Sequence, residues 1–360
     1  MSSMPAEPVA LGNSGSIDKD GGDNPVSAGF PGSVLGHRDV SVVVPTYRRP
    51  AMLARCLEAL IAQDIDAERF EILVCDDGPD DATRELVERL RVEQAERGLE
   101  IRYLAVTRTQ GPAGARNAGW RAARAPVVAF TDDDTVPDPH WLQAGIAALE
   151  NGAAAAAGTI VVPLPDRPTD YEADASGLAQ TEFATANAFV VRTFLVMTGG
   201  FDERYTAAWR EDSDLQFTLM DVGGQVIRAP DAVVIHPVRP GRWGVSIAQQ
   251  KKSQFDALLY KKHPTFFRAR IRARPPLLYY AILCMALLAL SAAFAGDAVA
   301  ASIGIVGWFL LTAFFCAVRL RGRNRSARHI AEMAWTSMCI PFLSIFWRLY
   351  GAVRFKVLFL

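Results

Sequence analysis

The chain has 360 residues, of which 50% are hydrophobic and 21% charged, and this length allows one or two domains. Its 38 basic and 39 acidic residues leave a formal net charge of −1, which argues against a nucleic-acid partner. The five cysteines show no C-x-x-C spacing, so the sequence indicates neither a disulfide framework nor a zinc site, as expected in a reducing cytosol.

Residues 1–38 are rich in Gly, Ser, Pro and Asp and have no apolar core, which predicts a disordered leader rather than a signal peptide. From residue 39 onward, short apolar runs alternate with amphipathic segments. Strands are predicted at 41–44, 70–75, 101–106, 127–130, 155–162 and 225–235, and helices at 52–63, 82–97 and 113–124. The alternation predicts an α/β domain over residues 39–265, with a mostly parallel central sheet and helices on both faces.

Polar residues follow directly after three of the predicted strands. They are Thr46-Tyr47-Arg48, Asp76-Asp77-Gly78 and Asp132-Asp133-Asp134. The carboxyl ends of parallel strands meet at one edge of a sheet, and this is where open α/β sheets bind their ligands. A nucleotide lying across that edge would therefore contact all three groups.

The three consecutive aspartates after the strand at 127–130 point to a metal. Their negative charges repel one another unless a positive group lies among them. Mg²⁺ and Mn²⁺ prefer oxygen ligands and are held by one or two carboxylates together with substrate phosphates. The pattern predicts a metal–diphosphate site. An exposed acidic turn that caps the following segment is the alternative.

Six short motifs, in this order and at this spacing, resemble glycosyltransferase family 2, whose members have the nucleotide-sugar-binding fold called GT-A. The resemblance covers about residues 40–240. The motifs are residues 43–49 (VVPTYRR), 75–78 (CDDG), 114–119 (GARNAG), 130–134 (FTDDD), 199–203 (GGFDE) and 211–215 (EDSDL). Each motif is common by itself, whereas the ordered set is specific.

The resemblance implies a binding site for the nucleotide of a nucleotide-sugar donor. Its residues would be Pro45, Thr46, Tyr47, Arg48, Asp76, Asp77, Arg116, Asp132 and Asp133. Pro45, Thr46 and Tyr47 would line the base and ribose pocket. Asp77 would accept a hydrogen bond from a base N–H group, with Asp76 as the alternative. Arg116 would contact either the nucleotide or a carboxylate at a strand end.

The resemblance also implies a divalent cation, Mg²⁺ or Mn²⁺, as cofactor. Asp132 and Asp134 match the family's Asp-x-Asp element: Asp134 would bind the metal, and Asp132 would bind the metal or the ribose. Asp133 could take the place of either. His236, which follows the predicted strand at 225–235, would be a metal or phosphate ligand, or else a structural histidine.

Asp212 matches the family's general base, which removes a proton from the acceptor hydroxyl in an inverting transfer. The neighbouring carboxylates Glu211 and Asp214 would raise its pKa. A charged helix start is the alternative interpretation of this segment. The acceptor side would be shaped by Asn187, Gly199, Gly200, Phe201 and Glu211.

The C-terminal part of the chain has a different composition. Residues 277–295 and 298–318 are uncharged apolar stretches, each about 30 Å long as a helix, which matches the hydrocarbon core of a bilayer. Arginines precede the first stretch and follow the second, so the positive-inside rule predicts a transmembrane hairpin (266–328) with both ends in the cytoplasm. A buried hairpin of a soluble domain is the alternative.

The last segment, residues 329–360, contains an apolar stretch that carries two charged residues and is interrupted by Pro341. It is predicted to be an interfacial or re-entrant helix, not a span. Together these features predict a multi-pass protein of the inner (cytoplasmic) membrane whose catalytic domain faces the cytoplasm.

The combined interpretation is a glycosyltransferase that acts on a lipid-linked or other glycan acceptor at the membrane surface. Processive synthases of the family carry Gln-x-x-Arg-Trp, but Arg239 stands here in place of the glutamine, before Arg242-Trp243. This departure, and only two predicted spans, favour the transfer of one sugar per encounter. The alternatives are sugar transfer to polyprenyl phosphate and an inactive membrane scaffold for glycan assembly.

Overall fold

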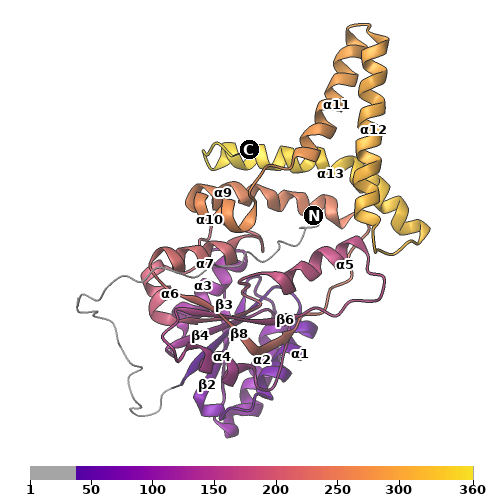
Figure 1. Cartoon of the computed structure of the whole chain (residues 1–360). Helices are drawn as coiled ribbons and strands as arrows, with labels where there is room; N and C mark the ends of the chain where they lie inside the picture. Colours follow the sequence, from indigo (N-terminus) through magenta and orange to yellow (C-terminus); the bar gives the residue numbers. More distant parts are fainter. Residues whose placement is uncertain (1–37, 360) are drawn as a thin grey trace, which may run out of the picture.

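The computed structural model describes residues 38–359, in which an α/β domain is followed by a layer of helices and a projecting helical hairpin (Figure 1). The predicted leader therefore lies outside the described residues, apart from Arg38. The first strands and helices alternate as the sequence predicts. They are β1 (Val40–Thr46), α1 (Pro50–Ile61), β2 (Phe70–Asp76), α2 (Asp81–Gln94), β3 (Glu100–Ala105), α3 (Pro112–Ala122) and β4 (Val127–Thr131).

One eight-stranded sheet, in the order β3-β2-β1-β4-β7-β6-β8-β5, forms the centre of the domain. Strands β1, β2, β3 and β4 pair in parallel, so the polar segments that follow β1, β2 and β4 lie at one edge, as predicted. The second half consists of β5 (Val136–Pro137), β6 (Ala155–Val161), β7 (Asn187–Val191) and β8 (Val226–Ile235). Its helices are α4 (Trp141–Leu149), α5 (Asp170–Ala175), α6 (Arg192–Thr198) and α7 (Glu211–Asp221).

Strand β7 was not predicted, and it runs antiparallel to both of its neighbours, β4 and β6. Its apolar residues continue into the apolar helix α6 without a Gly or Pro between them, so the sequence shows no boundary. The pairing places β7 in the middle of the sheet, where it joins the parallel half to the strands that carry the rest of the site.

The core lies on both faces of the sheet because successive side chains of a strand point to opposite sides. In β1, Val42 and Val44 pack with α1, whereas Val43 packs on the other face. The glycines allow close approach: a Cβ atom on Gly119 of α3 would lie 2.4 Å from a methyl carbon of Val43. Helix α3, which carries Arg116, is thereby held directly on the sheet.

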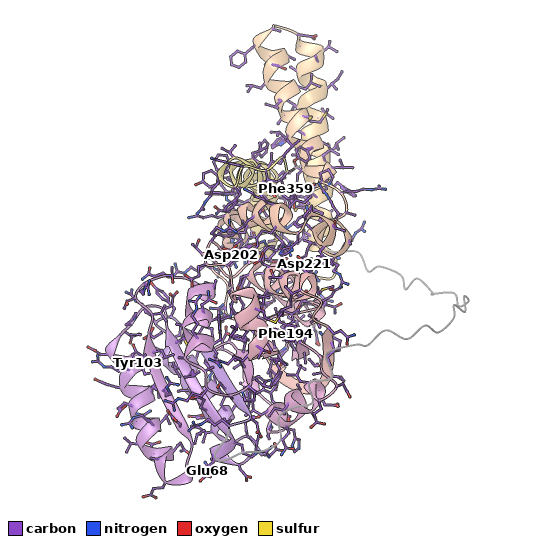
Figure 2. The ribbon with its side chains drawn as sticks, turned by 90° about the vertical axis from the view of Figure 1, so that its left-hand side faces the viewer. Glu68, Tyr103, Phe194, Asp202, Asp221 and Phe359 are labelled. Atoms are coloured by element: carbon purple, nitrogen blue, oxygen red, sulfur yellow. The ribbon has the colours of Figure 1, made fainter. Side chains whose placement is uncertain are left out.

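A layer of helices separates the sheet domain from the hairpin (Figure 1). It contains α8 (Val245–Gln249), α9 (Gln254–Lys262) and α10 (Pro264–Phe266). At the end of α9, the Lys262 ammonium contacts Asp202 at 3.0 Å and Asp214 of α7 at 2.6 Å. Figure 2 shows Asp202 and Asp221 at this junction, with Phe359 beyond them next to the last helix. The layer is therefore fixed to the helix that carries the predicted catalytic base.

Three long helices complete the chain: α11 (Leu277–Phe294), α12 (Ala298–Leu320) and α13 (Ala327–Arg354). By length and composition, each is apolar enough to cross a membrane. Helices α11 and α12 coincide with the two predicted stretches and form the hairpin, and α13 lies crosswise at its base (Figure 1). The expected interruption at Pro341 is wrong, because α13 continues through this residue. Packing of buried neighbours such as Ile340 and Ser344 holds the helix together there.

The contact between α13 and α9 predicts a sensitive position at Gly351. A Cβ atom there would lie 2.3 Å from the Gln254 carbonyl oxygen, so Gly351→Leu should separate the two helices. The expected loss of stability is about 1–3 kcal/mol, measured as thermal unfolding of the detergent-purified chain. Gly177→Leu is the control, because nothing lies within 4 Å of its added Cβ. Equal melting temperatures of the two variants would contradict the close contact.

Candidate functional site

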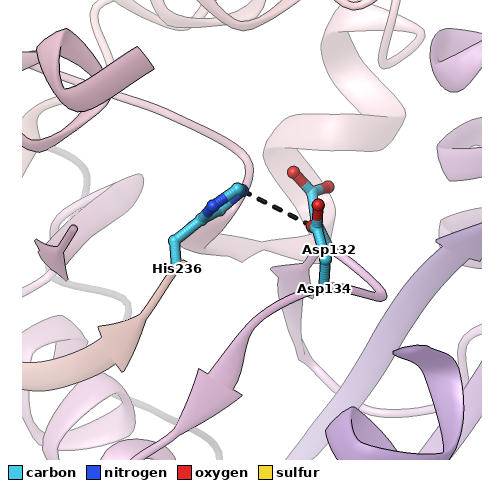
Figure 3. Close-up of side chains that lie close together, drawn as sticks. All are labelled: Asp132, Asp134 and His236. Atoms are coloured by element: carbon cyan, nitrogen blue, oxygen red, sulfur yellow. Dashed lines mark ion pairs between the residues drawn. The ribbon is translucent and has the colours of Figure 1, made fainter. Parts of the chain in front are cut away.

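Asp132, Asp134 and His236 form a cluster at the carboxyl edge of the sheet. Each offers one ligand atom, and these atoms all lie within 4.8 Å of one another. The aspartates come from the loop after β4, and His236 follows β8; Figure 3 shows the imidazole facing the two carboxylates. The antiparallel pairing of β5 with β8 brings these distant segments together, since Val136, two residues after Asp134, lies opposite Ile235, which directly precedes His236.

The ligand set fits a divalent cation. Two carboxylates and one imidazole suit Mn²⁺ and related metals, and they leave positions open for phosphate oxygens. Asp134 is nearly buried, and its second oxygen lies 3.0 Å from Nε of Arg239 and 3.9 Å from a guanidinium nitrogen of Arg49. These arginines line the same space and would attract the phosphates of a nucleotide.

Asp133 is not a member of this cluster. One carboxylate oxygen accepts a hydrogen bond of 2.7 Å from the Thr46 hydroxyl, and the other lies 2.9 Å from Arg49. Burial raises the pKa of the Asp133 carboxyl to about 6. Of the three aspartates, the structure therefore brings Asp132 and Asp134 to the possible metal site, while Asp133 and Thr46 tie the loops after β4 and β1 together.

Arg116 of α3 joins two of the predicted motifs. One of its guanidinium nitrogens contacts Asp132 at 2.8 Å, and the other contacts Glu211 at 3.1 Å. The side chain is almost fully buried and its charge also lies over the ring of Phe201. Burial by itself lowers the pKa of Arg116. The nearby carboxylates of Asp132, Asp212 and Glu211 raise it by more than burial lowers it, so the guanidinium stays charged. Of its two predicted partners, the structure gives Arg116 the strand-end carboxylate.

The acidic pair at the start of α7 has perturbed protonation. Burial and the adjacent Asp212 carboxylate raise the pKa of Glu211 to about 8. Burial also raises the pKa of Asp212, and Arg116 offsets this only in part. Thr185 fixes the Asp212 carboxylate, since its hydroxyl donates at 2.9 Å and its N–H group at 3.3 Å. A carboxylate with a raised pKa is well suited to accept a proton near neutral pH.

The loop after β2 separates the roles of its two aspartates. Asp76 is fully buried and its oxygens accept from the Gly78 N–H group, the Asp80 N–H group and the Tyr103 hydroxyl. Asp77 is half-buried, and both of its oxygens lie within 2.9 Å of the Gly111 nitrogen. Asp76 thus shapes the loop, and Asp77 is the one that a nucleotide could reach.

The residues after β1 remain open to a ligand. Pro45 lies within β1, and the Tyr47 ring is about half exposed. This ring covers Gly78 so closely that a Cβ there would lie 2.5 Å from a ring carbon. Arg48 has a positive φ of 52° and places its guanidinium over the same ring. The loops after β1 and β2 are therefore in direct contact.

Asn187 does not belong to the predicted acceptor side. It is buried in the sheet, where its amide donates to the carbonyls of Thr159 and Ala232 and accepts from the Trp141 indole. Its hydrogen bonds hold β6, β7 and β8 together, so it is a structural residue.

The Gly199-Gly200-Phe201 turn lies against α3, and both glycines have a positive φ. The Asn117 amide of α3 binds both the N–H and the carbonyl of Phe201, which packs edge-on against Phe130. Through Phe201, whose ring lies under the Arg116 guanidinium, this turn helps to hold Arg116 in place.

Several residues at the site were missed by sequence reasoning. In the sequence, Arg49 is only the last residue of the first motif, and Arg239 only stands where processive synthases have glutamine. No motif or periodicity marks Thr185. Arg210, in the strained position before Glu211 with a φ of 76°, binds Asp256 of α9 at 2.8 Å. These contacts join residues far apart in the chain, so neither spacing nor periodicity could reveal them.

Comparison with known proteins now identifies this arrangement. Residues 41–201 match the model of the family described as Glycosyl transferase family 2. This segment of the chain is therefore similar to glycosyltransferase family 2. The chain is 27% identical over 213 residues to glycosyltransferase AglE of Haloferax volcanii, covering 56% of this chain and 67% of that protein. It is 37% identical over 135 residues to the validoxylamine A glucosyltransferase of Streptomyces hygroscopicus subsp. limoneus, but covers only 27% of its length.

A solved structure confirms the predicted GT-A fold. The mannosyltransferase PcManGT from Pyrobaculum calidifontis, in complex with GDP-Man and Mn²⁺, superimposes with a TM-score of 0.53. The two chains are 20% identical, and the match covers 87% of this chain and 88% of that one. The likeness therefore extends beyond the sheet domain into the C-terminal helices.

The bridging position of Arg116 predicts a large loss of stability in Arg116→Met. Removing one partner of a buried charge network leaves Asp132 and Glu211 without a counter-charge, at an expected cost of about 3–5 kcal/mol. Arg121→Met on the same helix is the control, because this side chain is 54% exposed and should contribute at most about 1 kcal/mol. Chemical unfolding of the purified chain compares the two. Equal losses would show that Arg116 has no special role.

Proposed function

We propose that this protein is a membrane-bound, metal-dependent, inverting glycosyltransferase. It would move one sugar from a nucleotide-sugar donor to a hydroxyl of a lipid-linked glycan acceptor at the cytoplasmic face of the membrane. The observation that carries the proposal is Arg116, which holds the Asp-x-Asp loop and the Glu-Asp helix start on opposite sides of one buried cation. Two chemically different groups thus face the same space: a metal–diphosphate site and a proton acceptor.

The donor would lie across the edge formed by the loops after β1, β2 and β4. Tyr47 offers a half-exposed ring to the nucleotide base, and Asp77 can accept a hydrogen bond from an N–H group of that base. Asp132, Asp134 and His236 would hold the divalent cation, Mg²⁺ or Mn²⁺. The chemistry that such a cation supplies when bound is neutralisation of the departing diphosphate. Arg49 and Arg239 supply positive charge from the protein itself at the same place.

The acceptor hydroxyl would lose its proton to Asp212 as its oxygen attacks the anomeric carbon from the face opposite the nucleotide. Thr185 orients the Asp212 carboxylate for this step. Glu211 lies deeper and binds Arg116, so it would position the base and stay away from the sugar. The direction of attack, with the base and the leaving group on opposite sides, corresponds to inversion at the anomeric carbon.

The membrane placement is supported by the two faces of α13. Its buried face carries polar side chains, including Thr336, Ser337 and Arg348. Its exposed large apolar residues are Ile330, Trp335, Met338, Phe346, Leu349, Tyr350 and Val353, while the exposed Arg328 and Arg354 lie near its two ends. A helix that keeps its internal polar side chains against the protein and exposes many large apolar ones is suited to lipid. With α11 and α12 as spans, the catalytic edge would lie beneath the bilayer, where lipid-linked acceptors are concentrated.

The proposed activity predicts metal-dependent release of nucleotide from a donor in the presence of membrane lipid extract. A panel of nucleotide sugars should include GDP-mannose, the donor present in the Pyrobaculum structure. Asp212→Asn should lower kcat by about 10²–10⁴-fold, because the proton acceptor is lost. Asp221→Asn, at the far end of the same helix, is the control and should keep its activity. A fully active Asp212→Asn variant would exclude Asp212 as the proton acceptor, whereas a variant without turnover that still complements a deletion strain fully would favour an inactive scaffold.

The raised pKa of Asp212 predicts the acid side of the pH profile. Only the ionised carboxylate accepts a proton, so kcat/KM should fall as the pH drops through the folded-state pKa of Asp212. That midpoint should lie above about 4, the ordinary value for an aspartate. The midpoint is measured from initial rates after brief exposure to each pH. Return of full activity at neutral pH shows that the protein has not unfolded. A midpoint at or below the ordinary value would contradict the desolvation of the Asp212 carboxylate.

A further inference from the structure

A cavity of about 350 Å³ lies at the end of α12, formed by two segments far apart in the sequence. One wall is the loop after β6, with Asp166 and Arg167; the other is the turn between α12 and α13, with Gly322, Arg323 and Arg325. The two walls are joined by a hydrogen bond of 2.9 Å from the Asn324 N–H group to the Pro168 carbonyl. None of these residues belongs to the proposed donor, metal or base sites.

The cavity has an excess of positive charge that the protein does not neutralise. Three arginines line it against one aspartate, and none of the three forms an ion pair within residues 38–359. Nε of Arg323 is buried and has no hydrogen-bond partner. By contrast Arg319, one turn earlier, binds Asp170 at 2.6 Å and the hydroxyls of Thr336 and Ser337. Arg319 thus pairs with an acidic residue of the protein, whereas Arg167, Arg323 and Arg325 form no ion pair within residues 38–359.

The position of the cavity defines what kind of anion can reach it. The uncharged run of α12, residues 298–318, is long enough to cross the hydrocarbon core, so the next few residues lie at the level of the lipid headgroups. The turn after α12 lies at the base of the hairpin, on the side of the sheet domain (Figure 1). This step rests on the membrane placement in the proposed function, though not on the enzyme's chemistry.

We propose that this cavity binds the phosphate headgroup of an anionic membrane lipid. Guanidinium groups match phosphate oxygens with paired hydrogen bonds, and basic pockets beside cytoplasmic helix ends are typical sites for anionic headgroups. A lipid phosphate between Arg167 and Arg323 would bridge the loop after β6 to the hairpin. That loop leads into α5 and then to Thr185, so the bound lipid would also fix the segment beside the catalytic base.

The test uses the detergent-purified full chain without any nucleotide sugar. Dioctanoyl phosphatidylglycerol is titrated while thermal unfolding and native mass spectrometry report binding. Arg323→Gln/Arg325→Gln should bind this lipid about 30-fold more weakly, because each basic residue near an anionic headgroup contributes about 1 kcal/mol. The control, Arg321→Gln/Arg328→Gln, makes the same change of charge in the same segment but does not line the cavity. It should bind like the unaltered protein.

Each other outcome overturns the proposal. Equal weakening in both double variants would mean diffuse attraction and no site. An equal response to inorganic phosphate would indicate a free-anion site, and an equal response to dioctanoyl phosphatidylcholine would exclude recognition of net charge. If the first double variant fails to fold, Arg167→Gln tests the opposite wall. Because no donor is present, a failure here is distinct from a failure of the proposed transferase activity.

Discussion

The buried Arg116 guanidinium, held between Asp132 and Glu211, is the interaction on which the site depends. Without it, the loop after β4 and the start of α7 would bring like charges together in a region that water barely reaches. Burial opposes the ionisation of Asp132, but Arg116 lowers its pKa; at Glu211, burial and the adjacent Asp212 carboxylate outweigh Arg116 and raise the pKa. The carboxylates on the two sides of this arginine therefore have pKa values shifted in opposite directions.

A second buried network connects this site to the helical layer. The Asp256 carboxylate of α9 contacts Arg210 at 2.8 Å on one oxygen and Arg348 of α13 at 2.9 Å on the other. Arg210 directly precedes Glu211 and has a left-handed backbone conformation, which persists only when the surroundings hold it. The crosswise helix α13 thus reaches the residue before α7 through two ion pairs, and the C-terminal helices are part of the support of the candidate site.

Much of the architecture could be predicted because it follows from local pattern. Alternating apolar runs marked β1, β2, β4 and the helices between them, and uncharged length marked α11 and α12. Pattern failed where packing decides. Strand β7 has no boundary from α6 in the sequence, and Pro341 does not end α13 because its neighbours are buried on both sides. Asn187, which the family resemblance suggested for the acceptor side, instead donates its amide hydrogens to backbone carbonyls inside the sheet.

The sequence alone determined the fold class, the resemblance to glycosyltransferase family 2, the two long apolar helices and the order of the acidic motifs, since these depend on composition and spacing along the chain. Only the tertiary structure decided which member of each motif faces the site. It buried Asp133 and Asp76 among hydrogen bonds within the protein, placed Asp134 beside Asp132 and His236, left Asp77 half-buried, and added Arg49, Arg239 and Thr185. Adjacent side chains differ in direction and in partners, and those partners come from segments that meet only in the folded chain.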